Sequence, residues 1–189
     1  MAFELIVIGT SVGGLNALSA LLRGLPSTFS LPLVVVQHRS ADGRSGVREV
    51  LQSYTDLTVV EAEDKDAIVA GRLYLAPADY HLLIEADRTL ALSTEEAVQN
   101  ARPSIDVLFE SAAEVYRESL VGVVLTGASA DGARGVQRIK QCGGWLIVQD
   151  PATAESRVMP EAALSVVEAD EVVPLDRLAG SLRQLVAMG

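Results

Sequence analysis

The feature that most constrains the fold of this chain is the alternation of short apolar runs with amphipathic segments. Four runs are almost wholly apolar: residues 3–9 (FELIVIG), 31–38 (LPLVVVQH), 120–127 (LVGVVLTG) and 143–149 (GGWLIVQ). Parallel strands that helices cover on both faces have this composition, because neither face meets water. The pattern predicts an α/β fold, with a doubly wound, mainly parallel sheet flanked by helices.

The remaining strands and helices follow from the same periodicities. Further strands are predicted at residues 57–63 and 171–175, and helices at residues 15–25, 43–53, 105–116, 132–141 and 178–186. Two of these helices begin after a side chain that favours an N-cap. Ser104 precedes the third helix and Asp176 precedes the last one.

One segment departs from the alternation. Residues 71–77 (GRLYLAP), 81–86 (HLLIEA) and 89–93 (TLALS) are all strand-like, and Ala86-Asp87-Arg88 suits a tight turn. We therefore predict one antiparallel β-hairpin, inserted at about residues 71–93 into the parallel pattern.

Length and composition limit the classes of protein that this chain can belong to. Its 189 residues are 49% hydrophobic and 21% charged, which is typical of a single globular domain, taken here as residues 1–189. The net charge of −10 argues against nucleic acid as a partner. The single cysteine, Cys142, excludes an intrachain disulfide and suits a reducing compartment. Without a signal-peptide pattern or a bilayer-length apolar run, a cytoplasmic protein that does not insert into membranes is predicted.

The first strand leads into a glycine-rich loop, Gly9-Thr10-Ser11-Val12-Gly13-Gly14. Ligands of doubly wound sheets bind beyond the carboxyl ends of the strands, so this loop is a candidate site. A dinucleotide loop would need glycine in place of Ser11 and an acidic residue in place of Gln37-His38, and a P-loop would need Gly-Lys-Ser/Thr. The loop instead matches G-x-S-x-G, the turn that exposes a nucleophilic serine before a helix. A glycine-rich turn with an incidental serine is the alternative.

Two other strand ends carry a candidate base and a candidate carboxylate. His38 follows the second apolar run, where it could be the general base for Ser11 or a buried structural histidine. Asp131 lies in the loop LTGASADGARG, where it could accept the Nδ1–H of His38 or cap a helix. The only other histidine, His81, lies in the predicted hairpin. Together the three strand ends predict a Ser-His-Asp triad in that chain order.

Other polar residues are weaker candidates. The acidic run EAEDKD, with Asp64 and Asp66, is typical of a solvated surface, and Asp150 before a proline is typical of a turn. The segment Arg102-Pro103-Ser104 could bind a carboxylate or start a helix. With two separate histidines and one cysteine, no metal and no cofactor are predicted.

Seven segments resemble the catalytic domain of the CheB-type chemotaxis protein-glutamate methylesterases, in the order of that family. They are IGTSVGGLNAL, VVVQH, GRLYLAPADYHLL, RPSIDVLFESAAE, VGVVLTG with DGARG, CGGWLIVQDPATA and MPEAAL, and they span nearly the whole chain. The resemblance implies a serine hydrolase that demethylates glutamate γ-methyl esters on the cytoplasmic signalling domains of chemoreceptors and releases methanol. Many family members also deamidate glutamine in the same receptors.

The resemblance also implies roles for single residues. The catalytic triad of the family falls on Ser11, His38 and Asp131, and its non-catalytic histidine falls on His81. Backbone N–H groups near Val12 would contribute to the oxyanion site.

A second oxyanion donor is implied at Ala128. The side chains of this pocket depart from the family pattern, which has a small polar residue at Val12 and Met-Gly at Ala128-Ser129. An apolar residue and a proline are likewise replaced by Arg39-Ser40.

The implied partners are methylated chemoreceptor domains and, because no receiver domain is found in residues 1–189, a separate regulatory protein. Three alternatives stay open at this point. The chain could be a catalytically weak or inactive receptor-binding scaffold, an esterase acting on another protein, or a nucleotide-binding module. The missing glycine and the missing acidic residue that would bind the ribose argue against the nucleotide-binding module.

Overall fold

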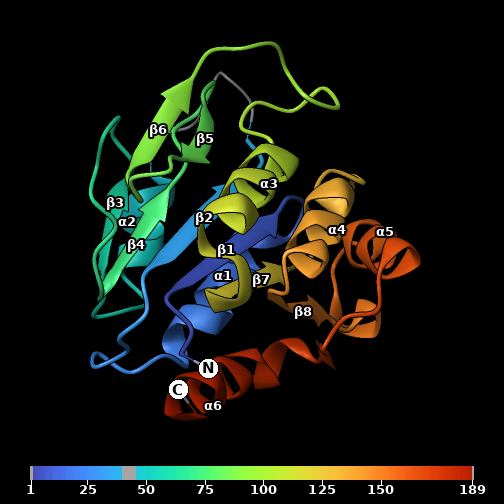
Figure 1. The fold of residues 1–189 in the computed structure, drawn as a ribbon. Helices are drawn as coiled ribbons and strands as arrows, with labels where there is room; N and C mark the ends of the chain where they lie inside the picture. The colour runs from blue at the N-terminus through green and yellow to red at the C-terminus, as the bar shows by residue number, and fades with distance from the viewer. Residues whose placement is uncertain (1, 40–45, 189) are drawn as a thin grey trace.

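The centre of the molecule is a seven-stranded sheet in which every pairing is parallel, as the apolar runs predict (Figure 1). The computed structural model describes residues 2–39 and 46–188. The strand order is β3-β4-β2-β1-β7-β8-β9. The strands are β1 (Leu5–Thr10), β2 (Leu33–Gln37), β3 (Thr58–Glu61), β4 (Arg72–Leu75), β7 (Leu120–Val124), β8 (Trp145–Gln149) and β9 (Glu171–Val173).

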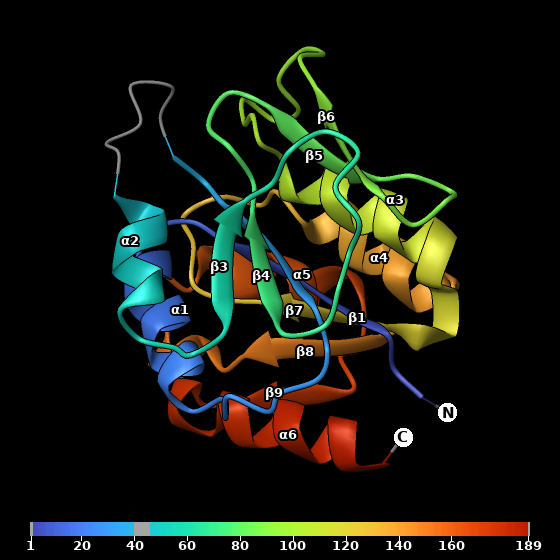
Figure 2. The same ribbon diagram turned by 90° about the vertical axis from the view of Figure 1, so that its left-hand side faces the viewer.

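Helices cover both faces of this sheet. They are α1 (Gly14–Arg23), α2 (Val47–Gln52), α3 (Ile105–Tyr116), α4 (Ala133–Gln141), α5 (Val158–Val166) and α6 (Leu178–Met188). Two buried clusters show which helices share a face: α3, α4 and α5 contribute to one, and α1, α2 and α6 to the other. Figure 2 shows α1 and α2 on one side of the sheet and α3 and α4 on the other.

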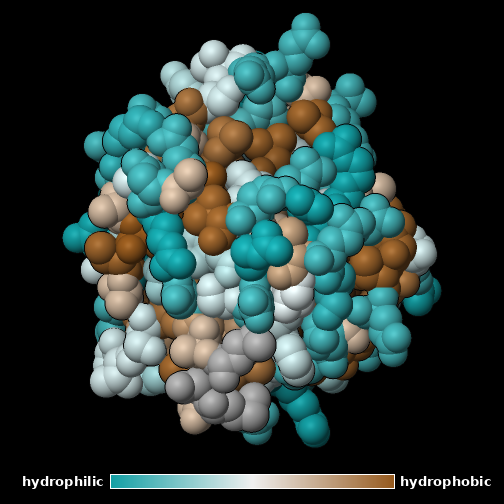
Figure 3. All heavy atoms as spheres, viewed as in Figure 1, coloured by the Kyte–Doolittle hydropathy of each residue, from teal (hydrophilic) through white to brown (hydrophobic). Residues whose placement is uncertain are grey.

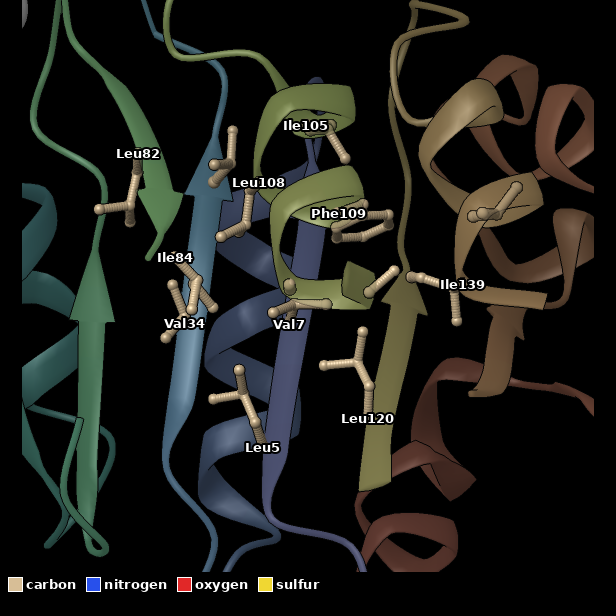
Figure 4. Close-up of a cluster of buried hydrophobic side chains, with 14 of the residues drawn as sticks. Leu5, Val7, Val34, Leu82, Ile84, Ile105, Leu108, Phe109, Leu120 and Ile139 are labelled. Carbon is tan, nitrogen blue, oxygen red and sulfur yellow. The ribbon is translucent and has the colours of Figure 1, made fainter. Parts of the chain in front are cut away.

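Side chains of the central strand alternate between the two cores. Leu5 and Val7 of β1 belong to the cluster under α3, whereas Ile6 and Ile8 belong to the cluster under α1. Figure 4 shows the first cluster, with Phe109 and other residues of α3 packed over the strands. Because both faces of the strand are buried, residues 5–8 of β1 are apolar, and its one polar side chain, Thr10, lies at the last position, where its Oγ1 donates to Thr126 O.

The predicted antiparallel hairpin is present, but it begins later than expected. It consists of β5 (His81–Ile84) and β6 (Leu90–Ser93), joined by a turn around Ala86-Asp87-Arg88. The first strand-like segment of the prediction, Arg72–Leu75, is instead β4, between β3 and β2 in the parallel sheet. Its last three residues are fully buried, which a strand covered on both faces requires and a half-exposed hairpin strand does not.

Several helix boundaries differ from the prediction. The helix expected at residues 43–53 covers Val47–Gln52, and its predicted start lies outside the described residues. The Asp176 cap is wrong, because a 3-10 turn (Leu175–Arg177) after Pro174 precedes α6 and already contains Asp176. Ser104 does occupy the N-cap position of α3, but its side chain makes no capping hydrogen bond.

The face of the molecule seen in Figure 3 is mainly polar. Figure 3 shows hydrophilic side chains over most of the α3 and α4 region and a group of hydrophobic ones between the hairpin and α3. Within residues 2–39 and 46–188, every helix is too short or too polar to cross a bilayer.

Candidate active site

Three strand ends come together at the carboxyl edge of the sheet. Thr10 pairs with Gln37 across β1 and β2, so Ser11 and His38 are the next residues on two neighbouring strands. The backbone continues this pairing, since His38 N–H donates to Thr10 O at 3.0 Å. On the other side of β1, Ser11 N–H donates to Thr126 O at 3.0 Å, in the loop that follows β7. The serine is therefore held between the strand that carries His38 and the loop that carries Asp131.

Ser11 occupies a tight turn between β1 and α1. Gly13 has φ 77°, a left-handed conformation that favours glycine. A Cβ on Gly14 would lie 2.1 Å from Gln37 Oε1, so a side chain does not fit there either. The backbone N–H groups of Val12 and Gly13 donate to no acceptor among the described residues. These two donors lie beside the serine at the start of a helix, which is the arrangement that anion stabilisation needs.

His38 contacts Asp131 directly. His38 Nε2 lies 2.7 Å from Asp131 Oδ2, with the His38 side chain 15% exposed and the Asp131 side chain fully buried. The expectation that Asp131 holds Nδ1 is wrong. Because β1 lies between β2 and β7, His38 has to reach across the end of β1, and Nε2 is the ring nitrogen farther from the backbone. Nδ1 is the ring nitrogen without a hydrogen-bond partner among the described residues, and no hydrogen bond joins it to Ser11 Oγ.

Asp131 receives four hydrogen bonds. Besides His38, the donors are Ser104 Oγ at 2.8 Å, Ile105 N–H at 2.7 Å and Asp106 N–H at 3.0 Å. Burial raises the pKa of Asp131, but these hydrogen bonds outweigh it and hold the pKa below its usual value. Asp131 is thus an ionised carboxylate that both contacts His38 and caps α3, a helix that comes before it in the sequence. The contact with the histidine is present, whereas the helix that Asp131 caps is α3 and not α4, the helix that its loop leads into.

Asp106 makes the reciprocal contact and was not singled out from the sequence. It lies in the first turn of α3, yet its Oδ1 accepts the N–H groups of Gly132 at 2.9 Å and Gly135 at 2.8 Å, at the start of α4. Its Oδ2 accepts from Gln99 Nε2 at 2.8 Å. Burial raises the pKa of Asp106 above its usual value. The only sequence signal was an acidic residue near a helix start, which is ordinarily assigned to its own helix.

His81 is a structural histidine. It is buried, its Nδ1 accepts the Ser104 N–H at 3.2 Å, and its Nε2 lies 3.0 Å from Glu96 O. These contacts satisfy both ring nitrogens. His81 therefore supports the start of α3 behind Asp131 and does not contact Ser11.

The weaker candidates have structural partners. Asp64 accepts the Leu92 N–H, Asp66 accepts the Glu63 N–H and Asp150 accepts the Ala152 N–H, each within its own loop or against the hairpin. Arg102 binds Asp79 and the carbonyls of residues 94 and 95. In the part of the chain that the structure describes, no three His, Cys, Asp or Glu side chains are grouped to hold a metal ion.

A pocket of about 510 Å³ opens on the His38 side of the site. It is lined by His38, Arg39, Asp79, Ala97, Asn100, Ala101, Arg102 and Pro103. The two residues expected at the oxyanion site, Val12 and Ala128, do not line it. Both are exposed, with Val12 49% exposed. The Arg39 position, where the chain departs from the family pattern, is part of the pocket wall.

Residues 6–182 match the family model described as CheB methylesterase. The chain belongs to the CheB methylesterase family. This assignment rests on nearly the whole sheet and both helical layers, because the match runs from β1 into α6.

Relatives of this CheB-family protein support the assignment over at least 95% of its length. A putative protein-glutamate methylesterase/protein-glutamine glutaminase of Leptospira interrogans is 47% identical over 179 residues, covering 95% of this chain and 93% of the relative. A protein-glutamate methylesterase/protein-glutamine glutaminase of Symbiobacterium thermophilum is 35% identical over 98% of this chain and 51% of its own length.

A crystal structure shows the same fold. The CheB methylesterase catalytic domain of Thermotoga maritima matches with a TM-score of 0.93 and 34% identity, covering 98% of this chain and 100% of that one. The predicted fold class is confirmed, and so is the predicted enzyme class: this CheB-family protein is a hydrolase of the chemotaxis methylesterase kind.

Proposed function

We propose that this protein hydrolyses glutamate γ-methyl esters on the cytoplasmic signalling domains of chemoreceptors, with Ser11 as nucleophile, His38 as general base and Asp131 as the carboxylate that orients it. The observation that carries this proposal is the 2.7 Å contact between His38 Nε2 and the buried Asp131, formed beside Ser11 at the edge where three strands end. The reaction would take place in the cytoplasm, where these receptor domains lie.

The first half of the reaction transfers the acyl group to the enzyme. His38 Nδ1 accepts the Ser11 proton while Ser11 Oγ bonds to the ester carbonyl carbon. Asp131, ionised and fully hydrogen-bonded, stabilises the imidazolium through Nε2–H. The Val12 and Gly13 N–H groups, with the N–H near Ala128, donate hydrogen bonds to the developing oxyanion, and one such donor is worth about 3–4 kcal/mol. The tetrahedral intermediate then expels methanol, which takes its proton from His38.

The second half releases the product. A water gives a proton to His38 Nδ1 and attacks the acyl-enzyme carbonyl, and Ser11 leaves with that proton. The receptor side chain is released as a free glutamate carboxylate. The same steps acting on a glutamine would release ammonia, so deamidation needs no additional group. A separate regulatory protein acting on this domain is part of the proposal.

The decisive test replaces the nucleophile. Ser11→Ala should lower methanol release from methylated receptor by at least about 1000-fold, since the covalent route is lost. It should also abolish covalent labelling by a serine-reactive fluorophosphonate. Ser165→Ala is the matched control, because Ser165 is an exposed serine that bonds only to Ala162 O in its own helix.

Two outcomes would contradict the proposal. Wild-type turnover in Ser11→Ala would remove Ser11 from the nucleophile role. Receptor binding by the wild-type chain, without fluorophosphonate labelling and without methanol release, would favour the inactive scaffold instead.

A further inference from the structure

We infer that Gln37 is a positioning residue for the reaction, because its side-chain amide ties the backbone of the nucleophile to the backbone of the base. Gln37 is the last residue of β2 and is 7% exposed. It stands where a dinucleotide-binding fold would place an acidic residue, and it takes no part in the proton transfers of the proposed mechanism. The inference rests on the proposed roles of Ser11 and His38.

One nitrogen makes both connections. Gln37 Nε2 donates to Ser11 O at 2.9 Å and to His38 O at 2.9 Å. These carbonyls belong to residues that leave neighbouring strands of the sheet, after the regular pairing of β1 with β2 has ended at Thr10 and Gln37. The amide therefore extends the strand-to-strand connection by one residue, to the two residues that must exchange a proton.

The orientation of the amide is determined by these two carbonyls. Gln37 Oε1 is buried without a hydrogen-bond partner among the described residues, and it lies against Gly14, where a Cβ would be 2.1 Å away. Turning the amide over would place Oε1 against two carbonyl oxygens, which repel it. A buried polar atom without a partner is unfavourable, and such atoms in native structures ordinarily have a functional reason. Here the unpaired oxygen results from pointing both N–H bonds at the nucleophile and the base.

Both backbone polar groups of Ser11 are therefore hydrogen-bonded. Its N–H donates to Thr126 O in the loop that leads to Asp131, and its C=O accepts from Gln37 Nε2 and from the Gly14 N–H, each at 2.9 Å. Proton transfer between Ser11 and His38 depends on their separation, and a misplacement of about 1 Å can cost about 100-fold in rate. Gln37 touches neither substrate nor reacting atoms, so its loss should lower kcat and leave KM nearly unchanged.

The test compares two glutamines that make the same kind of contact. Gln37→Met keeps the length of the side chain and removes both N–H bonds. Gln52→Met is the control, because Gln52 Nε2 also donates to two backbone carbonyls, Thr55 O at 3.1 Å and Leu57 O at 2.9 Å, at the end of α2. We expect Gln37→Met to lower kcat by about 10- to 100-fold with KM within twofold, and to slow fluorophosphonate labelling of Ser11 to a similar extent. Gln52→Met should lower stability and leave kcat, per folded molecule, unchanged.

A kcat for Gln37→Met within threefold of Gln52→Met, both corrected for the folded fraction, would overturn the inference. Turnover by the wild type and by Gln52→Met reports on the proposed function alone. Failure of the proposed function is therefore distinguishable from failure of the inference about Gln37. If Gln37→Met does not fold, Gln37→Leu also lacks the donors without adding a charge and should show the same loss of kcat at unchanged KM.

A measurement on the unsubstituted chain gives an independent result. The NMR signals of the Gln37 side-chain amide should show slow exchange with water and should shift when Ser11 is modified by the fluorophosphonate. Fast exchange and no shift would overturn the inference even if neither variant folds.

Discussion

Asp131 and Asp106 are two buried aspartates that do the same structural task with different chemical consequences. Each accepts backbone N–H groups at the start of a helix that is not its own: Asp131, just before α4, caps α3, and Asp106, in α3, caps α4. Figure 1 shows these helices side by side on one face of the sheet. Only Asp131 also contacts a histidine. Comparing the two residues therefore separates the effect of capping a helix from the effect of orienting the proposed base.

The fold shifts the pKa values of the two carboxyl groups in opposite directions. Burial raises the pKa of both, but in Asp131 the hydrogen bonds from His38, two backbone N–H groups and Ser104 outweigh burial and lower the pKa. In Asp106 burial is the larger effect, and the pKa is raised although Arg134 lies 3.6 Å away. Burial alone therefore does not set the pKa of such a group, because hydrogen-bond donors lower it and the nearby Asp131 carboxylate raises that of Asp106.

The largest expected effect comes from replacing each carboxylate by an amide. Asp131→Asn should lower turnover by about 10³- to 10⁴-fold, because the amide no longer supports the His38 tautomer that the reaction needs. Asp106→Asn should keep turnover within about tenfold, since its Oδ1 can still accept from the two glycine N–H groups. Methanol release from methylated receptor checks both. An equal loss in the two variants would mean that Asp106 is more than a support.

The next comparison uses the pH dependence of stability. The pKa of Asp131 is below its usual 3.8 in the fold, so its contribution to the free energy of unfolding is present above that pH and lost as pH falls through the folded pKa. The pKa of Asp106 is raised, so its contribution becomes less favourable as pH rises from 3.8 through the folded pKa.

Urea unfolding of the two variants against the wild type between pH 3 and pH 7 measures this difference. Relative to wild type, Asp131→Asn should lose more stability at pH 7 than at pH 3, whereas Asp106→Asn should become relatively more stable as pH rises. Parallel pH profiles for the two variants would contradict the opposite pKa directions.

The smallest expected effect is at Ser104, which donates one of the hydrogen bonds to Asp131. Ser104→Ala should cost about 1 kcal/mol of stability and lower turnover several-fold, because Asp131 keeps its other three donors. Ser119→Ala is the control, since Ser119 donates to Tyr116 O at the far end of α3. If Ser119→Ala lowers turnover as much as Ser104→Ala, the effect comes from α3 as a whole and not from Asp131.

The strands and the candidate residues at their ends could be predicted because they depend on local composition. Strands that are buried on both faces of a parallel sheet have to be mainly apolar, as residues 120–127 are. Ser11 and His38 lie at the ends of such runs, and Asp131 lies in the loop that follows residues 120–127. The start of the hairpin could not be predicted in the same way. Arg72–Leu75 is strand-like in either setting, and only its position between β3 and β2 makes it parallel.

The sequence by itself therefore determined the type of fold, the strand ends that carry the candidate residues and the family of the chain. The tertiary structure decided which atoms meet. Nε2 of His38 contacts Asp131 because β1 separates their strands, and Gln37 reaches two carbonyls because β1 and β2 end together. The reciprocal caps of α3 and α4 depend on the packing of two helices about 30 residues apart in the chain. Local patterns specify the elements, whereas hydrogen bonds between distant residues depend on distances that exist only after the elements have packed.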